Sequence, residues 1–281
     1  MTGYRICALY SGSGGNSLYI SAAGKEILID AGKNARALCR ALTDIGTDIK
    51  NIHAIFITHE HSDHVSALEI ISKHHSIPIH LTDLSAERFD REPDAFIHKN
   101  LVRHTEEYET VLGELQIHSF RTPHDSMMSV GYRIDFSDEC GEHSIGVATD
   151  IGYVTRGICR NLEGCEAVVL ESNHDEDMLR EGRYPYELKR RILSNKGHLS
   201  NKSSAAFAAH LAATGTKAFM LAHLSEENNT PDTALDEFIS AVADPSVAIT
   251  VAAPDTPTEM LLSKKEIYEY AFAEDNMCGN T

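Results

Sequence analysis

The sequence lacks a hydrophobic run long enough to cross a lipid bilayer, which argues against a membrane-spanning protein. It also lacks internal repeats and low-complexity segments, and no secretory pattern follows Met1. The six cysteines are scattered without a C-x-x-C pair, so we expect free thiols in a reducing compartment. They are Cys7, Cys39, Cys140, Cys159, Cys165 and Cys278. Together these absences predict a cytoplasmic globular protein.

Positive charge is also scarce in this chain. Lys and Arg total 25 against 42 Asp and Glu, which gives a formal net charge of −17. Such an excess opposes non-specific binding to nucleic acid, although it is compatible with a local basic patch. Residues 189–202 form one acid-free segment, and its cations are Lys189, Arg190, Arg191, Lys196 and Lys202. This segment is either a solvated helix end or a surface for phosphate groups.

The 281 residues are 42% hydrophobic and 24% charged, as in an ordinary globular protein. Short apolar runs predict strands near residues 5–9, 17–21, 26–30, 52–57, 78–81, 115–120, 129–136, 144–149, 167–171 and 217–222. Helical patterns occur near residues 34–44, 64–75, 83–91, 184–194, 202–213 and 231–242.

The densest chemical feature is the run T-H-E-H-S-D-H at residues 58–64. His59 and His61 lie two residues apart, so in an extended segment their side chains point the same way. Asp63 and His64 are adjacent and can turn toward a second point. The run follows a predicted strand and precedes a predicted helix, which is where ligand sites occur in α/β sheets. A surface loop that binds nothing is the alternative, and the density of metal-binding residue types argues against it.

The pattern H-x-H-x-D-H resembles the metallo-β-lactamase superfamily. Other signature positions occur in the family's order, each after an apolar run, and they are Asp30, His124, Asp150 and His223. The resemblance covers about residues 4–239 and implies an α/β (α+β) fold, the four-layer αββα sandwich. It implies a single domain over residues 1–281, with the site where two βα halves meet. The spacing from Asp150 to His223 leaves no room for a β-CASP insertion.

The resemblance also implies a centre with two divalent metal ions. Three imidazoles would bind the first ion, those of His59, His61 and His124. The second ion would be bound by Asp63, His64 and His223. Asp150 would bridge both ions, and Asp30 would accept an imidazole N–H and orient the ring. These donors suit zinc, manganese and iron alike. A hydroxide bridging the ions would be the nucleophile, with Asp63 counted as catalytic.

The second half of the chain points to phosphodiesters. Glu171, then Gly197-His198, then His223 resembles ribonuclease Z-type nucleases, where an extra His supported by an acid contacts the phosphate. The corresponding catalytic residues here would be His198 and Glu171, and His198 falls inside the acid-free segment. His61 stands where oxygen-reducing members of the superfamily have Glu, which favours hydrolysis. A capping role for His198 is the alternative.

Several longer strings resemble the YycJ/WalJ subfamily, at residues 11–17, 173–175, 184–185, 188–192, 197–201 and 223–229. That subfamily is associated with 5′-to-3′ exonuclease activity on DNA and is linked genetically to cell-wall-sensing signalling. The resemblance therefore implies a metal-dependent nuclease that acts on DNA, preferably at 5′ ends. Contacts to the substrate phosphate are expected from Ser11, Asn16, Lys189, Arg191, Lys196 and Lys202. The glycine-rich loop at residues 11–17 is equally compatible with a plain turn between strands.

Two other functions remain compatible with the sequence. One is hydrolysis of a small ester, thioester, lactone or cyclic nucleotide. The other is a metal-stabilised regulatory partner in cell-wall signalling, without catalysis. The sequence does not choose among the metals, between DNA and RNA, or among oligomeric states.

Overall fold

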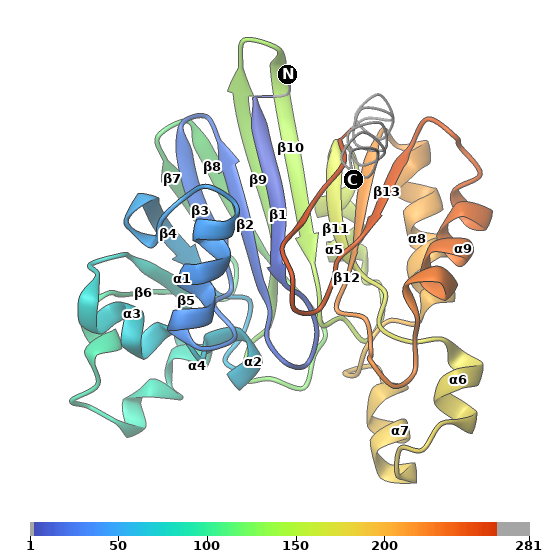
Figure 1. Cartoon of the computed structure of the whole chain (residues 1–281), viewed down its shortest axis with the longest axis horizontal. Coiled ribbons are helices and arrows are strands. Elements are labelled where there is room, and N and C mark those ends of the chain that lie inside the picture. The colour runs from blue at the N-terminus through green and yellow to red at the C-terminus, as the bar shows by residue number, and fades with distance from the viewer. Residues whose placement is uncertain (1–2, 263–281) are drawn as a thin grey trace, which may run out of the picture.

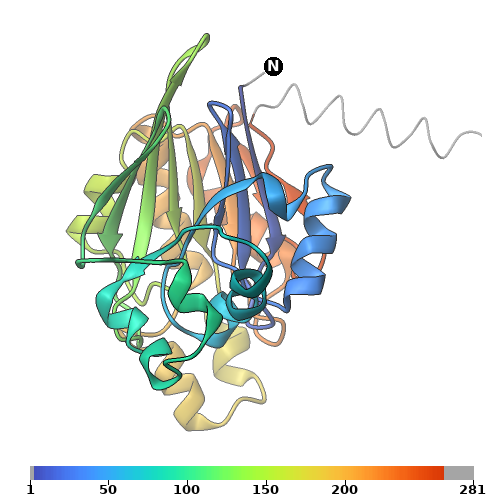
Figure 2. The same ribbon diagram turned by 90° about the vertical axis from the view of Figure 1, so that its left-hand side faces the viewer.

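The computed structural model describes residues 3–262 of the chain. Two seven-stranded sheets are stacked face to face, and helices cover both outer faces (Figures 1 and 2). The strand orders are β14-β1-β2-β3-β4-β5-β6 and β13-β12-β11-β10-β9-β8-β7. This is the predicted four-layer αββα sandwich, so the predicted fold class is confirmed. Cys278 and most of the acidic tail after Met260 lie outside the described residues.

The first sheet is antiparallel from β14 to β3 and parallel from β3 to β6. Its strands are β1 (Tyr4–Tyr10), β2 (Ser17–Ala22), β3 (Lys25–Ile29), β4 (Ile52–Phe56), β5 (Ile79–Thr82), β6 (Leu101–His104) and β14 (Thr258–Glu259). The helical elements of this half are α1 (Ala35–Asp44), η1 (Ile49–Asn51), α2 (Ser62–Val65), α3 (Leu68–His74), α4 (Asp83–Ala86), η2 (Phe89–Arg91) and η3 (Phe96–Lys99).

The second sheet is an antiparallel meander from β7 to β10 and parallel from β10 to β13. Its strands are β7 (Glu109–Leu112), β8 (Leu115–Arg121), β9 (Val130–Asp138), β10 (Gly141–Ala148), β11 (Ala167–Glu171), β12 (Ala218–Ala222) and β13 (Ala248–Val251). The helices are α5 (Arg156–Leu162), α6 (Glu176–Glu181), α7 (Tyr186–Ile192), α8 (Asn201–Ala213) and α9 (Pro231–Val242).

Three apolar layers hold the sandwich together. In β3, Ile27 and Ile29 face the layer between the sheets, whereas Leu28 faces the helices on the other side. In β11, Val169 faces the central layer and Val168 faces the outer helices. Strands that are buried on both faces are apolar at every position, which explains why their runs were readable in the sequence.

All ten predicted strands correspond to strands of the structure. The helix predicted at residues 64–75 is instead divided into α2 and α3, and the helix predicted at residues 83–91 ends as α4 and is followed by η2. The sequence did not predict β6, β7, β13, β14, α5 or α6. None of the helices within residues 3–262 is both long and apolar enough to cross a membrane.

The carboxyl ends of six strands meet at one edge of the sandwich, because β3 and β4 run parallel in one sheet and β8, β10, β11 and β12 run the same way in the other. Figure 1 shows α6 and α7 projecting beyond this edge. The segments that directly follow β3, β4, β8, β10 and β12 carry Asp30 and the seven predicted metal ligands.

Candidate metal centre

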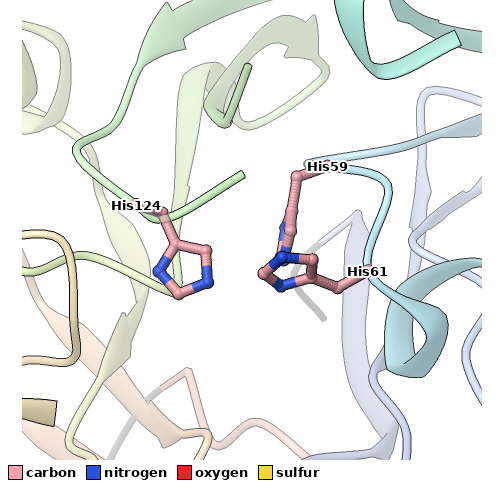
Figure 3. Close-up of side chains that lie close together, drawn as sticks. All are labelled: His59, His61 and His124. Carbon is pink, nitrogen blue, oxygen red and sulfur yellow. The ribbon is translucent and has the colours of Figure 1, made fainter. Parts of the chain in front are cut away.

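Two facing loops bring together the first three imidazoles. His59 and His61 lie on the loop between β4 and α2, and His124 follows β8 of the other sheet. Figure 3 shows the rings of His59 and His61 turned toward the ring of His124 across the gap between the loops. The ring centroids of His61 and His124 are 5.1 Å apart, and those of His59 and His124 are 5.0 Å apart.

The structure gathers all seven predicted ligands into three overlapping groups. Within each group, one ligand atom from every residue lies within 4.8 Å of the others. The groups are His59, His61 and His124, then Asp63, His64 and His223, and finally His59, His64 and Asp150. The first two groups have the composition of the two expected triads, and the third joins Asp150 to both of them.

Asp30 organises the rings of the first sheet. Its carboxylate accepts hydrogen bonds from the backbone N–H of Thr58 and from the Thr58 hydroxyl, both at 2.8 Å. It also lies 2.7 Å from Nδ1 of His64, and the Thr58 oxygen lies 3.0 Å from Nδ1 of His59. Because Nδ1 of each ring faces these partners, Nε2 of each ring faces the centre. Such outer partners fix ring orientation in metal sites.

The rings from the second sheet are held in the same way. Nδ1 of His124 lies 3.2 Å from the carbonyl oxygen of Gly197, and Nδ1 of His223 lies 3.0 Å from Oε1 of Glu171. Nε2 of both rings therefore faces the centre. His124 and His223 come from loops far apart in sequence, so tertiary structure alone sets their relative position.

Three buried polar atoms of the centre have no hydrogen-bond partner among residues 3–262, namely His59 Nε2, His223 Nε2 and Asp150 Oδ2. Leaving such an atom unpaired costs about 1–3 kcal/mol each. A divalent ion accepts electron pairs from imidazole nitrogen and carboxylate oxygen, so it would satisfy all three atoms. The residues present therefore fit divalent metal ions.

The protonation states of His59 and Asp150 suit this role. Burial lowers the pKa of His59 well below its usual value, and the neighbouring His64 and His124 lower it further, so the ring is neutral. Burial opposes ionisation of Asp150, but the imidazoles of His223 and His64 outweigh it and lower the pKa of the carboxyl. The centre thus combines a neutral imidazole with an ionised carboxylate, the forms that bind metal.

Backbone strain is concentrated at the centre. Asp30, Asp150 and His223 have φ angles of 64°, 56° and 59°, in the left-handed region that residues other than glycine rarely adopt. Each stands at or just after the end of its strand, where the chain must turn to present the side chain. Strain of this kind persists where the surrounding structure enforces it, as at functional sites.

Glu171 links the centre to His198. Oε1 of this fully buried carboxylate lies 2.8 Å from Nδ1 of His198 and 3.0 Å from Nδ1 of His223. Oε2 accepts the backbone N–H groups of Ile151 and Leu199, each at 2.9 Å. Glu171 therefore supports His198 as the sequence predicts, and it also orients a predicted ligand, which the sequence did not indicate.

His198 stands at the mouth of the centre with 18% of its side chain exposed. Burial opposes its charging, but the carboxylates of Glu171 and Asp150 outweigh this and raise its pKa to about 9. The ring is consequently an imidazolium at neutral pH. With Nδ1 held by Glu171, Nε2 is the nitrogen from which it can donate to a substrate.

Ser11 and Asn16, which the sequence suggested as phosphate contacts, make their hydrogen bonds inside the protein. Both are buried, and the Ser11 oxygen accepts the backbone N–H of His223 at 2.8 Å. The Asn16 amide donates to Oδ2 of Asp63 at 3.2 Å, while its oxygen accepts the N–H of Gly12. The glycine-rich loop therefore braces the ligand-bearing loops, because its polar groups are already engaged inside the protein.

The basic segment is divided between two environments. Arg191 donates to Oδ2 of Asp125 at 2.5 Å, and Oδ1 of Asp125 lies 3.3 Å from Nε2 of His124. Lys196 lines a cavity of about 560 Å³ that also reaches His124. Lys189 instead donates to the carbonyl oxygen of Arg180 in α6, and Lys202 is exposed in the first turn of α8. Within this segment, Arg191 and Lys196 are thus the two cations that the structure links to the centre.

The sequence analysis missed Glu60, which lies between two predicted ligands. Its buried carboxylate accepts the backbone N–H of Met127 at 2.7 Å and the hydroxyl of Ser85 at 2.8 Å. Met127 belongs to the loop that carries His124. Glu60 therefore connects the His59–His61 loop to the His124 loop. Its position between two predicted ligands was the feature of the sequence that could have indicated this role.

Glu60→Ala is expected to lower metal affinity about 10- to 100-fold, the range found for outer partners of metal ligands. The substitution keeps every proposed ligand but removes the hydrogen bond to Met127 that links the two loops, together with the bond from Ser85 of α4. Affinity would be measured by competition with a chromophoric chelator. Glu60→Gln is the matched control, because its amide oxygen can still accept from Met127. An affinity equal to that of the wild type in Glu60→Ala would contradict the role assigned to Glu60.

The chain matches known proteins over most of its length. Residues 25–224 match the family model described as "Beta-lactamase superfamily domain". The protein named "Exodeoxyribonuclease WalJ" of Streptococcus pneumoniae serotype 2 is 30% identical over 266 residues, which cover 92% of this chain and 97% of that protein. "Exodeoxyribonuclease YycJ" of Bacillus anthracis is 32% identical over 228 residues, or 81% and 84% of the two chains.

Among solved structures, the metallo-beta-lactamase fold protein YhfI from Bacillus subtilis superimposes with a TM-score of 0.69. The match covers 91% of this chain and 99% of that one, at 16% sequence identity. At that identity the likeness concerns the fold alone.

Proposed function

This chain belongs to the beta-lactamase superfamily and is a metal-dependent hydrolase, and on that premise we propose that it is a dinuclear phosphodiesterase, specifically a 5′-to-3′ DNA exonuclease. The observation that carries the proposal is the pair of Glu171 and His198 beside the grouped ligands. The two relatives that are named exodeoxyribonucleases support it, since each matches most of this chain.

In the proposed centre, His59, His61 and His124 would hold one ion, Asp63, His64 and His223 would hold the other, and Asp150 would contribute to both. When bound, the ions supply Lewis acidity toward the phosphate oxygens and acidify water. Zinc and manganese suit this mixture of imidazoles and carboxylates, and iron is a third candidate.

The chain's own residues would complete the reaction. Glu171 fixes the His198 imidazolium at Nδ1. Nε2 would then donate a hydrogen bond to the phosphate and afterwards a proton to the leaving oxygen. Glu171 acts as the positioning residue, because it holds His198 and His223 in one geometry. Arg191 and Lys196 would hold the neighbouring phosphates of the strand, with Arg191 exchanging Asp125 for the substrate.

We propose that DNA with a free 5′ end is the substrate and that the protein works in the cytoplasm as a single domain over residues 1–281. The location rests on the cysteines, since the five within the described part of the chain are free thiols. The single domain rests on the divided site, to which both sheets contribute ligands.

Replacing Arg191 and Lys196 together by Ala is expected to raise the KM for DNA about tenfold or more, and to leave hydrolysis of a small aryl phosphodiester unchanged. The slope of the logarithm of DNA affinity against the logarithm of salt concentration should also become shallower, by about one for each lost phosphate contact. The measurement is steady-state kinetics on both substrates over a series of salt concentrations.

Arg190→Ala is the control for this experiment, because Arg190 lies on the same helix but pairs with Glu187. An unchanged KM for DNA in the double variant would argue for a small-molecule hydrolase, with the metal centre left as described.

A further inference from the structure

A second group of metal-binding side chains lies on the outer face of the second sheet. Cys159 and Glu163 stand at the carboxyl-terminal end of α5, and His210 lies in the last turn of α8 (helices labelled in Figure 1). Their ligand atoms all lie within 4.8 Å of one another. About 13 Å of helix separates His210 from Asn201 at the catalytic edge, so this cluster is distinct from the centre described above.

The distances within the cluster are those of a small coordination site. The Cys159 Sγ atom lies 3.2 Å from Oε1 of Glu163 and 3.6 Å from Nε2 of His210, and Nε2 of His210 lies 2.7 Å from Oε1 of Glu163. Around tetrahedral zinc, with bonds of about 2.0–2.3 Å, neighbouring donors are separated by roughly 3.3–3.6 Å. Small side-chain adjustments would therefore place the three donors around one ion.

We infer that Cys159, Glu163 and His210 form a second metal site, which takes Zn²⁺ or another thiophilic divalent ion and leaves the fourth position to water. A thiolate, an imidazole and a carboxylate are all zinc ligands. The thiol selects against Mg²⁺ and Ca²⁺, which prefer oxygen donors.

The backbone beneath the cluster is held in place. The guanidinium group of Arg133 donates to the carbonyl oxygens of Asn161 and Glu163, at 3.0 and 3.1 Å, and so fixes the end of α5. Ile158 and Leu162 of α5 pack in the same apolar layer as Leu211 of α8. The two helices therefore present their donors from a common platform, and binding an ion requires no rearrangement of the fold.

Without an ion, the donors satisfy one another through hydrogen bonds to Glu163. Burial and the bond to Glu163 raise the pKa of the Cys159 thiol, so the sulfur carries a proton. Binding replaces that proton with the ion and releases it to water. The site gains the two positive charges of the ion and loses one proton, so its net charge rises by one.

The test is a Cd²⁺ titration of the full-length protein, followed through the ultraviolet charge-transfer band of cadmium thiolate. The proposed catalytic centre contains no cysteine, so the band reports only on thiol sites. The catalytic centre would first be saturated with Mn²⁺. The variants are Cys159→Ser, His210→Ala and Glu163→Gln, with the exposed Cys140→Ser as the matched control.

We expect a saturable band with one Cd²⁺ per chain that Zn²⁺ displaces, that Cys159→Ser abolishes and that Cys140→Ser leaves unchanged. His210→Ala and Glu163→Gln should each weaken binding at least about tenfold, because each removes one of three protein ligands. A band that survives Cys159→Ser, or wild-type affinity in both His210→Ala and Glu163→Gln, would overturn the proposal. Far-ultraviolet circular dichroism would verify that each variant is folded.

Discussion

Asp150→Asn is expected to reduce metal affinity by more than about 100-fold and to lower turnover correspondingly, since even outer partners of metal ligands contribute 10- to 100-fold. Asp150 is the one carboxylate grouped with ligands of both triads, and its unpartnered Oδ2 lies 3.4 Å from Nε2 of His64. The amide has nearly the same shape but lacks the charge that holds an ion among imidazoles. Asn also tolerates the left-handed backbone at this position, so strain does not complicate the result.

Asp30→Asn is the matched control for Asp150→Asn. Asp30 is equally buried and left-handed, but it contacts Thr58 and His64 on the side away from the ions. Its variant should bind metal about 10- to 100-fold more weakly and recover turnover when metal is in excess. Metal content per chain and turnover at rising metal concentration are the measurements. Full metal content with wild-type turnover in Asp150→Asn would contradict the bridging role.

His198→Ala is expected to retain its metal and to lose about 10²- to 10⁴-fold in turnover, the range for loss of a general acid. The pKa of His198 is raised to about 9, Glu171 engages Nδ1, and 18% of the side chain is exposed, so Nε2 is the nitrogen available to a substrate. Removing the ring leaves every proposed ligand in place. The effect should fall on kcat more than on KM, because the donated proton matters most as the bond to the leaving oxygen breaks.

Glu171→Gln separates positioning from catalysis. The amide oxygen can still accept the backbone N–H groups of Ile151 and Leu199, but the carboxylate oxygen that orients both His198 and His223 is replaced, so metal content must be measured alongside turnover. Turnover should therefore fall less than in His198→Ala. Loss of an ion in His198→Ala would reassign His198 as a ligand, since it also lies in a group with Asp150, Glu171 and His223. A wild-type rate in His198→Ala would refute the catalytic role.

The sequence was sufficient to predict that the proposed ligands come together at one edge of the sandwich. Asp30, His59, Asp150 and His223 each follow a strand whose last three residues are buried and apolar. Parallel strands bring their carboxyl ends to one edge, so residues that follow such runs must converge. The order of the motifs added the assignment to a family, which periodicity alone could not supply.

The less regular parts of the fold were not readable. β6 and β7 are edge strands and contain exposed charges such as Arg103 and Glu109, so they form no apolar run. The predicted helix at residues 64–75 is divided because the N–H of Ala67 donates to the carbonyl oxygen of Ala31. Ala31 lies in the loop after β3, far from Ala67 in the sequence, so no local pattern predicts this bond.

The contacts that complete the site were also beyond local reasoning. Ser11 and Asn16 look like phosphate donors in a glycine-rich loop, but His223 and Asp63 from distant segments engage them. Glu60 contacts Met127 in a loop of the other half. Such roles depend on which loops meet at the edge of the sandwich, and tertiary structure alone decides that.

The most direct test of the central claim is a time course on end-labelled duplex DNA with Mn²⁺, comparing 5′-phosphate and 5′-hydroxyl ends. His61→Ala is the control, because it removes one proposed ligand of the first ion. The proposal predicts stepwise shortening from the 5′ end by the wild type and none by His61→Ala. Intact DNA after incubation with metal-loaded wild-type protein, or shortening that His61→Ala does not abolish, would contradict it.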